Sequence, residues 1–182
     1  YHYANNTDWQ DLFYRTGVTT SHDLGVSGGS EKGSYKFGGS YYKDEAVIPG
    51  SDYIRYSLRA SVDQEVGAFR IGFSSNNNYS ITNGASLGMY GVLSMSPLAN
   101  PYNADGSLKR TVKMPQDENW VYTKQSMANL GDKWIDESKA YGSYNSVYGE
   151  LKIPWVEGLK ARINLGANYR SSNSGSYTGV GV

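Results

Sequence analysis

Two segments of the chain alternate regularly between apolar and polar residues. In segment 159–170 the odd positions, from Leu159 to Tyr169, are apolar, whereas the even positions carry lysine, arginine, asparagine or glycine. In segment 54–63 an apolar set that begins at Ile54 alternates with arginine, serine and aspartate. Because successive side chains of a β-strand point to opposite faces of its sheet, this period of two predicts strands with one apolar and one polar face.

Four further segments show a weaker form of the same alternation: 22–29, 34–43, 68–79 and 141–153. The lengths of the six predicted strands bracket the roughly 9–11 residues that a tilted strand needs to cross the hydrocarbon core of a bilayer. Prolines are confined to the segments between these strands or to their ends, as paired strands require. They are Pro49, Pro97, Pro101, Pro115 and Pro154.

The connections between the predicted strands alternate in length. Segments 30–33, 66–67 and 154–158 are tight turns, whereas 44–53 and 80–140 are long. Outer-membrane barrels have short turns on the periplasmic side and long loops on the extracellular side. If the tight turns are periplasmic, both long connections are extracellular.

Aromatic residues cluster near the two ends of the predicted strands and share the parity of the apolar face. This is where the aromatic girdles of a membrane barrel are expected, because rings with a polar edge prefer the headgroup level. Near the tight turns they are Tyr35, Phe69 and Trp155; near the long connections they are Tyr41, Tyr56, Tyr79, Tyr141 and Tyr169.

We therefore predict an all-β fold, an antiparallel transmembrane β-barrel in which the whole chain, 1–182, belongs to one barrel domain. Six strands are fewer than the roughly eight of the smallest common closed barrels, so we expect a fragment of a larger barrel. A soluble β-sandwich or lectin is the alternative, because its strands also alternate. The length of the strands and the charged residues at their centres favour a barrel with a water-filled lumen over a sandwich.

Composition narrows the class of protein further. The chain has 17 basic and 17 acidic residues, and this balance argues against a nucleic-acid partner. Mean hydropathy is −0.57, and no apolar run approaches the roughly 18 residues of a membrane helix. The chain opens with Tyr1-His2-Tyr3-Ala4, which is unlike an export signal, so we expect an internal start.

No enzyme site, cofactor site or metal site is expected. The chain has no cysteine, and its two histidines are His2 and His22, of which His22 is expected to have a structural role at a strand end. Residues 103–107 lack the bidentate acid of an EF-hand loop, so we expect a simple turn at Asp105-Gly106.

Two sets of residues are candidates for binding solute. The first set is the charged residues of the polar face: Lys36, Arg55, Arg59, Asp63, Arg70, Glu150, Lys152, Lys160, Arg162 and Arg170. These residues could instead form a solvated wall that pairs with a plug. Within this set Arg55, Arg59 and Arg162 are the candidate substrate contacts. The second set lies in connection 80–140, which could instead fold on itself or against a partner protein: Tyr90, Tyr102, Trp120, Tyr122 and Trp134.

Five stretches of the chain resemble SusC/RagA-type TonB-dependent outer-membrane proteins. Residues 6–11 (NTDWQD) and 13–17 (FYRTG) resemble the family's passage from plug to first strand, and 22–32 (HDLGVSGGSEK) resembles its first hairpin. Residues 50–59 (GSDYIRYSLR) are similar to its third strand, and 100–106 (NPYNADG) to a recurrent turn. The stretches occur in the family's order.

The resemblance implies a 22-stranded barrel with a plugged lumen in the cell outer membrane, of which this chain is the start. It implies import of glycan fragments or peptides, a surface lipoprotein of the SusD/RagB type as a lid, and energy from the TonB–ExbB–ExbD complex acting on the plug. The plug and the rest of the barrel would lie outside this chain, which would supply wall and extracellular loops in contact with outer-membrane lipid.

Two other functions compete with active import. One is a structural, adhesive or carbohydrate-binding β-domain, which should close on itself within these residues. The other is a passive porin, which shares the wall pattern but needs no plug.

Overall fold

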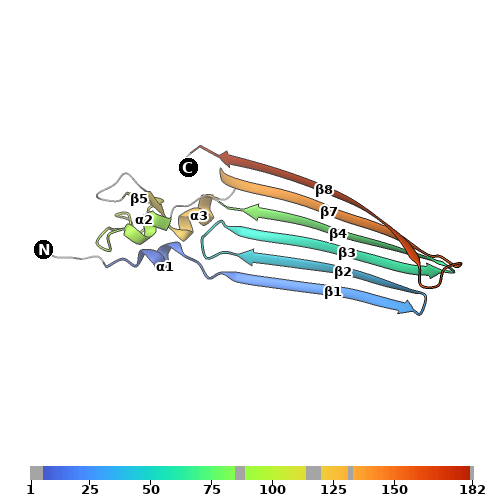
Figure 1. Ribbon diagram of the computed structural model, residues 1–182. Coiled ribbons are helices and arrows are strands. Elements are labelled where there is room, and N and C mark those ends of the chain that lie inside the picture. The colour runs from blue at the N-terminus through green and yellow to red at the C-terminus, as the bar shows by residue number, and fades with distance from the viewer. Residues whose placement is uncertain (1–5, 85–88, 114–119, 131–132, 181–182) are drawn as a thin grey trace.

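The chain forms a single curved antiparallel sheet with a small layer of helices and loops at one end (Figure 1). This computed structural model describes residues 6–84, 89–113, 120–130 and 133–180, without the side chains of 89, 113, 120–122 and 124. Six long strands follow the order β1-β2-β3-β4-β7-β8. They are β1 (Val18–Ser30), β2 (Gly33–Glu45), β3 (Asp52–Val66), β4 (Phe69–Asn83), β7 (Trp134–Lys152) and β8 (Lys160–Thr178).

All six predicted strands are confirmed, and each is longer than the alternation indicated. Connection 80–140 was predicted too long, because 80–83 continue β4 and 134–140 begin β7. These added residues are mostly polar on both faces. A strand that extends beyond the membrane is exposed to water on both faces, so the apolar alternation is lost. Its backbone still pairs with the neighbouring strand.

The register aligns the aromatic residues of the apolar face into one row. His22 pairs with Tyr41, Tyr41 with Tyr56, Tyr56 with Tyr79, and Tyr79 with Tyr141, across β1, β2, β3, β4 and β7. Ring centroids of successive members lie 6.3, 5.3 and 6.4 Å apart from His22 to Tyr79. A slip of one residue would turn a ring to the opposite face, so the apolar pattern excludes such a slip.

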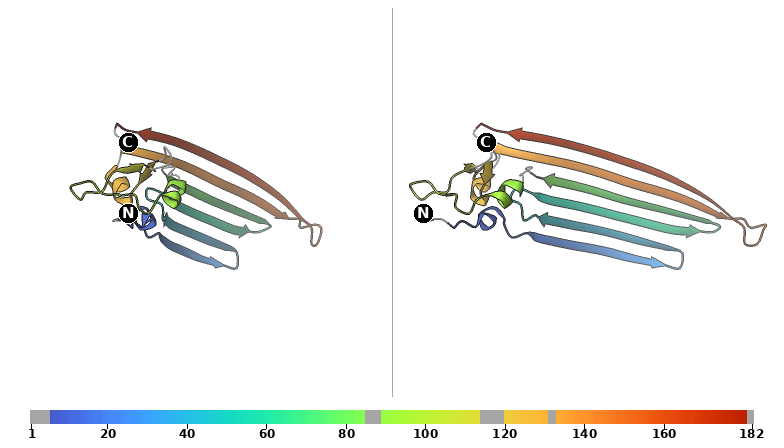
Figure 2. Two further views of the ribbon diagram at one scale, coloured as in Figure 1. Left: turned by 90° about the vertical axis from the view of Figure 1, so that its left-hand side faces the viewer. Right: turned by 60° about the vertical axis from the view of Figure 1, so that its left-hand side comes forward.

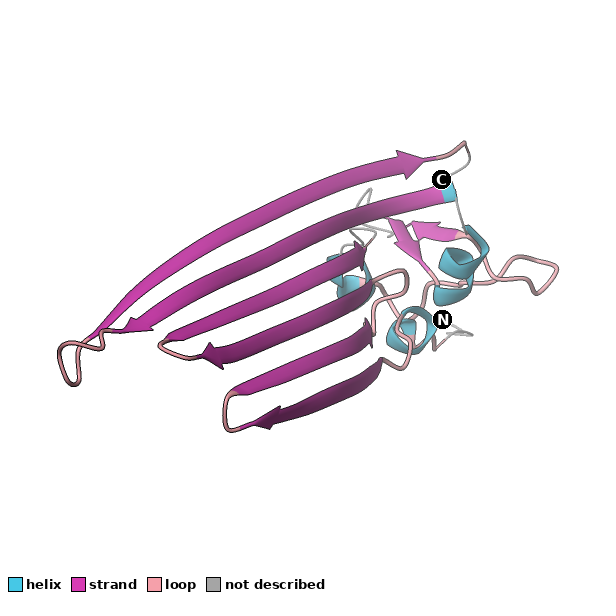
Figure 3. Ribbon diagram, turned by 90° about the vertical axis from the view of Figure 1, so that its right-hand side faces the viewer, coloured by secondary structure: helices cyan, strands magenta, loops and turns pink. Residues whose placement is uncertain are grey.

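The apolar face of the sheet is uncovered within the described residues. Figure 3 shows the six long strands side by side in one layer. Leu24 is 78% exposed, Ile163 69% and Leu58 65%, although they lie on the face predicted to be apolar. In a β-sandwich these side chains would be buried against a second sheet. The structure therefore agrees with the barrel fragment and not with the sandwich.

The remaining elements form a layer at the end of the sheet with the long connections (Figure 2). They are α1 (Trp9–Phe13), α2 (Met89–Ser94), β5 (Thr111–Lys113), β6 (Trp120–Tyr122) and α3 (Lys124–Leu130). The short helix α1 begins after Asp8, whose side chain accepts hydrogen bonds from the backbone N–H groups of residues 10 and 11. The long connection thus folds on itself, one of the alternatives for this segment.

A small hydrophobic core holds this loop layer together. Trp9 and Phe13 of α1 pack against Val92, Met95 and Val112 of the long connection. The indole Nε1 of Trp9 also donates a hydrogen bond of 2.9 Å to the carbonyl oxygen of residue 96. Residues 6–17 therefore belong to the loop layer; that a plug precedes them remains a prediction.

Candidate functional site

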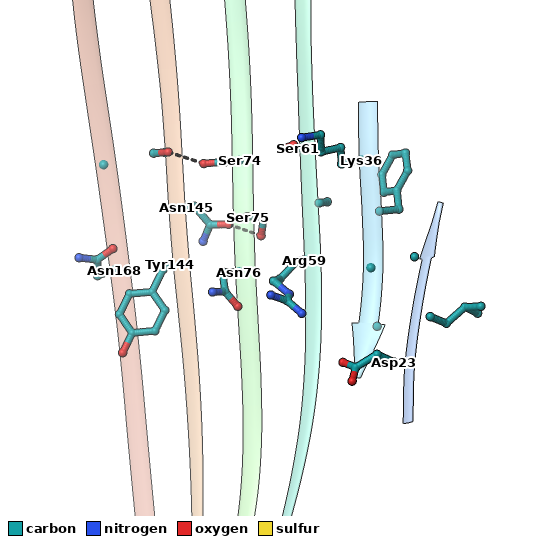
Figure 4. A pocket seen from close by; sticks show the side chains of 18 residues that line it. Asp23, Lys36, Arg59, Ser61, Ser74, Ser75, Asn76, Tyr144, Asn145 and Asn168 are labelled. Atoms are coloured by element: carbon teal, nitrogen blue, oxygen red, sulfur yellow. Dashed lines mark hydrogen bonds between the residues drawn. The ribbon is translucent and has the colours of Figure 1, made fainter. Parts of the chain in front are cut away.

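The charged residues predicted for the lumen share one face of the sheet. The register places Arg59 opposite Asn76, Asn76 opposite Tyr144, and Tyr144 opposite Asn168. Figure 4 shows these side chains in one band across β3, β4, β7 and β8. Around them lies a hollow of about 710 Å³, which Asp23 and Lys36 also line.

Near the tight turns the charges of this face are paired. The guanidinium of Arg70 holds the Asp63 carboxylate through two nitrogens, with Nε–Oδ1 at 3.0 Å and Nη2–Oδ1 at 2.7 Å. The hydroxyl of Tyr148 donates to the other oxygen of Asp63. Arg162 lies over the Tyr148 ring, with Cζ 4.0 Å from the ring centroid. These groups already satisfy one another, so they suit a structural wall better than a solute site.

Further ion pairs extend the network toward the turns. Lys152 Nζ lies 2.6 Å from Glu65 Oε1, and Lys160 Nζ lies 3.6 Å from Glu150 Oε1. Arg162 is 4.0 Å from the same Glu150 carboxylate. Of the three arginines predicted to contact substrate, Arg162 is therefore engaged by protein groups.

Toward the long connections the arginines of this face are available. Arg55 stacks over the ring of Tyr42, with Cζ 5.4 Å from the centroid, and both Arg55 and Arg59 are exposed. Neither forms an ion pair or hydrogen bond with any residue that the structure describes. They border a polar hollow of about 280 Å³ together with Asp23 and Asn78. Free guanidinium groups among hydroxyls and amides can bind carboxylates or hydroxyl-rich solutes.

A second candidate lies in the loop layer, at Tyr102. Its ring is 46% exposed and borders a cleft of about 460 Å³ that Gln125 and Asn129 of α3 also line. These two amides are one helical turn apart, so they share a face of α3. No described residue hydrogen-bonds either amide side chain.

The backbone around Tyr102 is firmly held. The N–H of Tyr102 donates to Asn100 Oδ1 at 2.9 Å, and Tyr102 forms a bridge with Leu108. The Ser126 hydroxyl donates to the carbonyl of Lys109 at 3.3 Å, which ties this hairpin to α3. The cleft is therefore largely preformed.

The turn at Asp105-Gly106 is confirmed. The N–H and hydroxyl of Ser107 donate to Asp105 Oδ1 at 3.0 and 2.6 Å, and these bonds lower the pKa of the Asp105 carboxyl. Gly106 has φ of 82°, a conformation that glycine adopts readily.

The other aromatic candidates do not join Tyr102 in one platform within the described residues. Tyr90 is 66% exposed on α2 and does not line the cleft. Trp134 was predicted to lie in the loop, but it begins β7 because the strand extends beyond the alternating segment. The side chains of Trp120 and Tyr122 lie outside the described residues.

Some residues of both sites were not anticipated from the sequence. Asn76, Tyr144 and Asn168 share one band with Arg59 only through cross-strand register, which the sequence does not specify directly. Gln125 and Asn129 had a weak signal, two amides four positions apart, but no helix was predicted there.

The arrangement defines a class of protein. A single antiparallel sheet with an exposed apolar face, a row of aromatic rings and a charged opposite face is the wall of a transmembrane β-barrel. None of the described helices is long and apolar enough to cross a membrane.

Comparisons with known proteins extend this assignment. The chain is 26% identical over 191 aligned positions to TonB-dependent receptor P3 of Formosa agariphila, covering 94% of the chain and 18% of that protein. It is 24% identical to TonB-dependent receptor SusC of Bacteroides thetaiotaomicron, covering 90% of the chain and 18% of SusC. No family model matches the chain.

Solved structures give the same result for the fold. The RagAB peptide importer in its closed-closed state matches with a TM-score of 0.78 and 18% identity, over 95% of the chain and 20% of the importer chain. A further RagAB structure matches with a TM-score of 0.78 and 20% identity. The resemblance to SusC/RagA-type TonB-dependent receptors is thus confirmed. The chain spans about a fifth of the length of these relatives and is similar to a part of their barrel.

Proposed function

We propose that the chain is part of the wall and extracellular loops of a TonB-dependent importer in the bacterial outer membrane. The observation that carries this proposal is the two-faced sheet, whose fold matches RagAB over 95% of the chain. The two curated relatives reported above are both named TonB-dependent receptors. The chain lies within one barrel domain, and a plug and further strands belong to other parts of the protein.

The two sites act at successive levels of the import path. Tyr102, with Gln125 and Asn129, meets the solute in the loop layer, where an aromatic ring and neutral amides suit a sugar ring or a peptide group. Arg55 and Arg59 meet it inside the barrel. The paired charges around Asp63 keep the wall below them rigid.

Partners follow from the same proposal. A surface lipoprotein of the SusD/RagB type covers the long-connection end, where the loop layer lies. The TonB–ExbB–ExbD complex supplies energy through the plug. Glycan oligomers and peptides are both compatible substrates, because neither site carries a feature that excludes one of them.

Uptake by the full-length protein tests the function. A strain that depends on this transporter is supplied with starch oligosaccharides or casein peptides, and accumulation is measured with and without TonB. We expect uptake of one substrate class and its loss without TonB. The Arg55→Gln/Arg59→Gln variant should reduce uptake tenfold or more, since the loss of even one charged hydrogen bond, about 1.5–3 kcal/mol, weakens binding about tenfold or more.

The matched control is Ser172→Gln in β8, which has the parity of Arg170 on the same face of the sheet and lines neither of the two hollows that border Arg55 and Arg59. It should import normally. Uptake that persists without TonB would indicate a passive porin. Normal uptake by the double variant would show that Arg55 and Arg59 do not bind the solute during import.

A further inference from the structure

The positive charge of the polar face is concentrated in its half toward the long connections. We define the outer band as the polar-face residues of the six long strands from the row of Arg55 to the row of Ser61. Among the described strands, Asp23 is the one carboxylate of this band. Its basic residues are Lys36, Arg55, Arg59 and Arg170. The outer band therefore has an excess of positive charge.

The half of the polar face toward the tight turns has no such excess. There every carboxylate that the described strands place on this face lies within 4.0 Å of a basic side chain. The pairs are Arg70–Asp63, Lys152–Glu65 and Lys160–Glu150. In the outer band no basic side chain forms an ion pair with a described residue. Its charges can therefore be neutralised from the lumen, by solvent ions or by a bound anion.

Arg55 and Arg59 present hydrogen-bond donors to the lumen. The guanidinium of Arg55 lies over the ring of Tyr42, with Cζ 5.4 Å from the ring centroid. Stacking of this kind orients the guanidinium but leaves the N–H donors in its plane free. Both arginines border the polar hollow of about 280 Å³, so one occupant can reach both. Ser57 and Asn78 add a hydroxyl and an amide to the same hollow.

The outer band lies at the mouth of the lumen. Arg55 precedes Tyr56 of the aromatic row, and Arg59 lies three residues beyond Tyr56 toward the tight turns. With about 3.4 Å per residue and a strand tilt of about 40°, Arg59 lies roughly 8 Å below the aromatic row. A solute that has passed the loop layer therefore meets Arg55 and Arg59 before it meets the paired charges around Asp63.

The charge of the outer band favours one kind of solute group. Amides and hydroxyls alone suffice to bind a neutral sugar ring or a peptide group. Free guanidinium groups add a strong and geometrically matched attraction for carboxylate and sulfate, and a wall of one sign of charge concentrates ions of the opposite sign. Asp23 does not neutralise Arg59, because it lies on β1 and Arg59 on β3, with β2 between them (Figure 4).

We propose that the outer band selects solutes that carry carboxylate or sulfate groups, and that Arg55 and Arg59 bind these groups. The cargo is thus an anionic oligomer. The inference rests on the import function proposed above, but it concerns the charge of the cargo, and its test measures binding and not uptake. TonB-dependent import of neutral starch oligosaccharides would support the proposed function and overturn this inference, whereas loss of TonB dependence would affect the proposed function alone.

Binding to the full-length protein in lipid nanodiscs, measured by isothermal titration calorimetry, tests the proposal with two matched pairs of oligomers. One pair is an oligogalacturonate and its neutral methyl ester, and the other is a glutamate-rich peptide and its glutamine counterpart. In at least one pair the charged member should bind about tenfold or more tightly than the neutral member, as expected from one charged hydrogen bond. The pair that shows this preference identifies the cargo as an acidic glycan or an acidic peptide. Equal binding within each pair, or no binding of either charged member, would overturn the proposal.

Substitutions assign the preference to the two arginines. Arg55→Gln/Arg59→Gln should weaken binding of the charged member about tenfold or more and leave binding of the neutral member unchanged. Arg59→Gln alone should act in the same direction. The control Lys139→Gln removes a positive charge from the opposite face of the sheet, where Lys139 Nζ lies 2.7 Å from Glu137 Oε1, and should change neither affinity. Resistance to heat in gel electrophoresis verifies that each variant is folded.

Two results with these variants would contradict the proposal. Equal losses for the charged and the neutral member would show that the arginines recognise hydroxyl or amide groups rather than charge. Unchanged binding would show that they contact another part of the protein, such as a plug. The unaltered protein gives an independent readout: raising the salt concentration from about 0.1 to about 1 M should weaken binding of the charged member severalfold and spare the neutral one. Salt-independent binding of the charged member would also overturn the proposal.

Discussion

Replacement of Val62 by arginine should destabilise the barrel by about 2–4 kcal/mol, because a charged side chain near the middle of the lipid-facing surface loses its hydration. Val62 lies between Tyr35 and Phe73 in the register, so its neighbours on this face are apolar rings. The free energy of unfolding of the full-length protein in lipid vesicles, measured by urea titration, gives the effect. The amount of assembled protein in the outer membrane should fall with it.

The adjacent residue provides the control for this substitution. Ser61 has the opposite parity and lies between Lys36 and Ser74 on the polar face. Ser61→Arg should change the free energy of unfolding little, because its guanidinium stays in water. Similar losses from Ser61→Arg and Val62→Arg would contradict the assignment of the two faces.

A valine at position 72 should destabilise the wall by about 1–3 kcal/mol through overpacking. Gly72 is buried, and a Cβ atom added there would overlap the ring of Tyr148. Tyr148 would have to move, and it would lose its hydrogen bond to Asp63 and its contact with Arg162. Urea titration in vesicles measures the loss.

Gly149 is the matched control for Gly72. It lies on the apolar face of β7, and an added Cβ meets no other described atom within 4 Å. Gly149→Val should therefore be neutral or slightly stabilising, because it adds apolar surface on the lipid side. A neutral effect of Gly72→Val would show that Tyr148 is free to move, against the tight network seen here.

The strands were predictable from the sequence where the environment differs between their faces. In 54–63 and 159–170 lipid and water select opposite residue types, so the period of two is clear. Beyond the aromatic row both faces are exposed to water, and polar runs such as 136–139 have no alternation to detect. The strand ends were therefore missed although the strand cores were found.

The sequence predicts which face of the sheet the candidate site residues lie on, but not which residues they contact. Parity alone put Arg55, Arg59 and Arg162 on one face. Which arginines are engaged depends on cross-strand neighbours: Arg162 reaches Tyr148 and Glu150, whereas Arg59 lies opposite Gly38 and Asn76. Sequence distance between these partners is too large for a local pattern to reveal them.

The loop layer shows the limit of counting aromatic residues. Trp9 was not proposed as part of it, yet its ring organises the core of that layer. Tyr102 keeps an exposed ring because the bridge to Leu108 and the buried Pro101 hold its backbone. The exposure of the Tyr102 ring depends on how the long connection folds, and the sequence of that connection shows no periodic pattern from which the fold could be predicted.

Spin labels at successive positions from 54 to 63 of the full-length protein in lipid vesicles test most directly whether the two faces of the sheet meet lipid and water. Collision rates with oxygen, which dissolves in lipid, should peak at the even positions, and those with a water-soluble nickel complex at the odd positions. The two profiles should thus alternate with a period of two and in opposite phase. Low oxygen collision rates at positions 58, 60 and 62, equal to those of a dry protein interior, would contradict a lipid-facing wall.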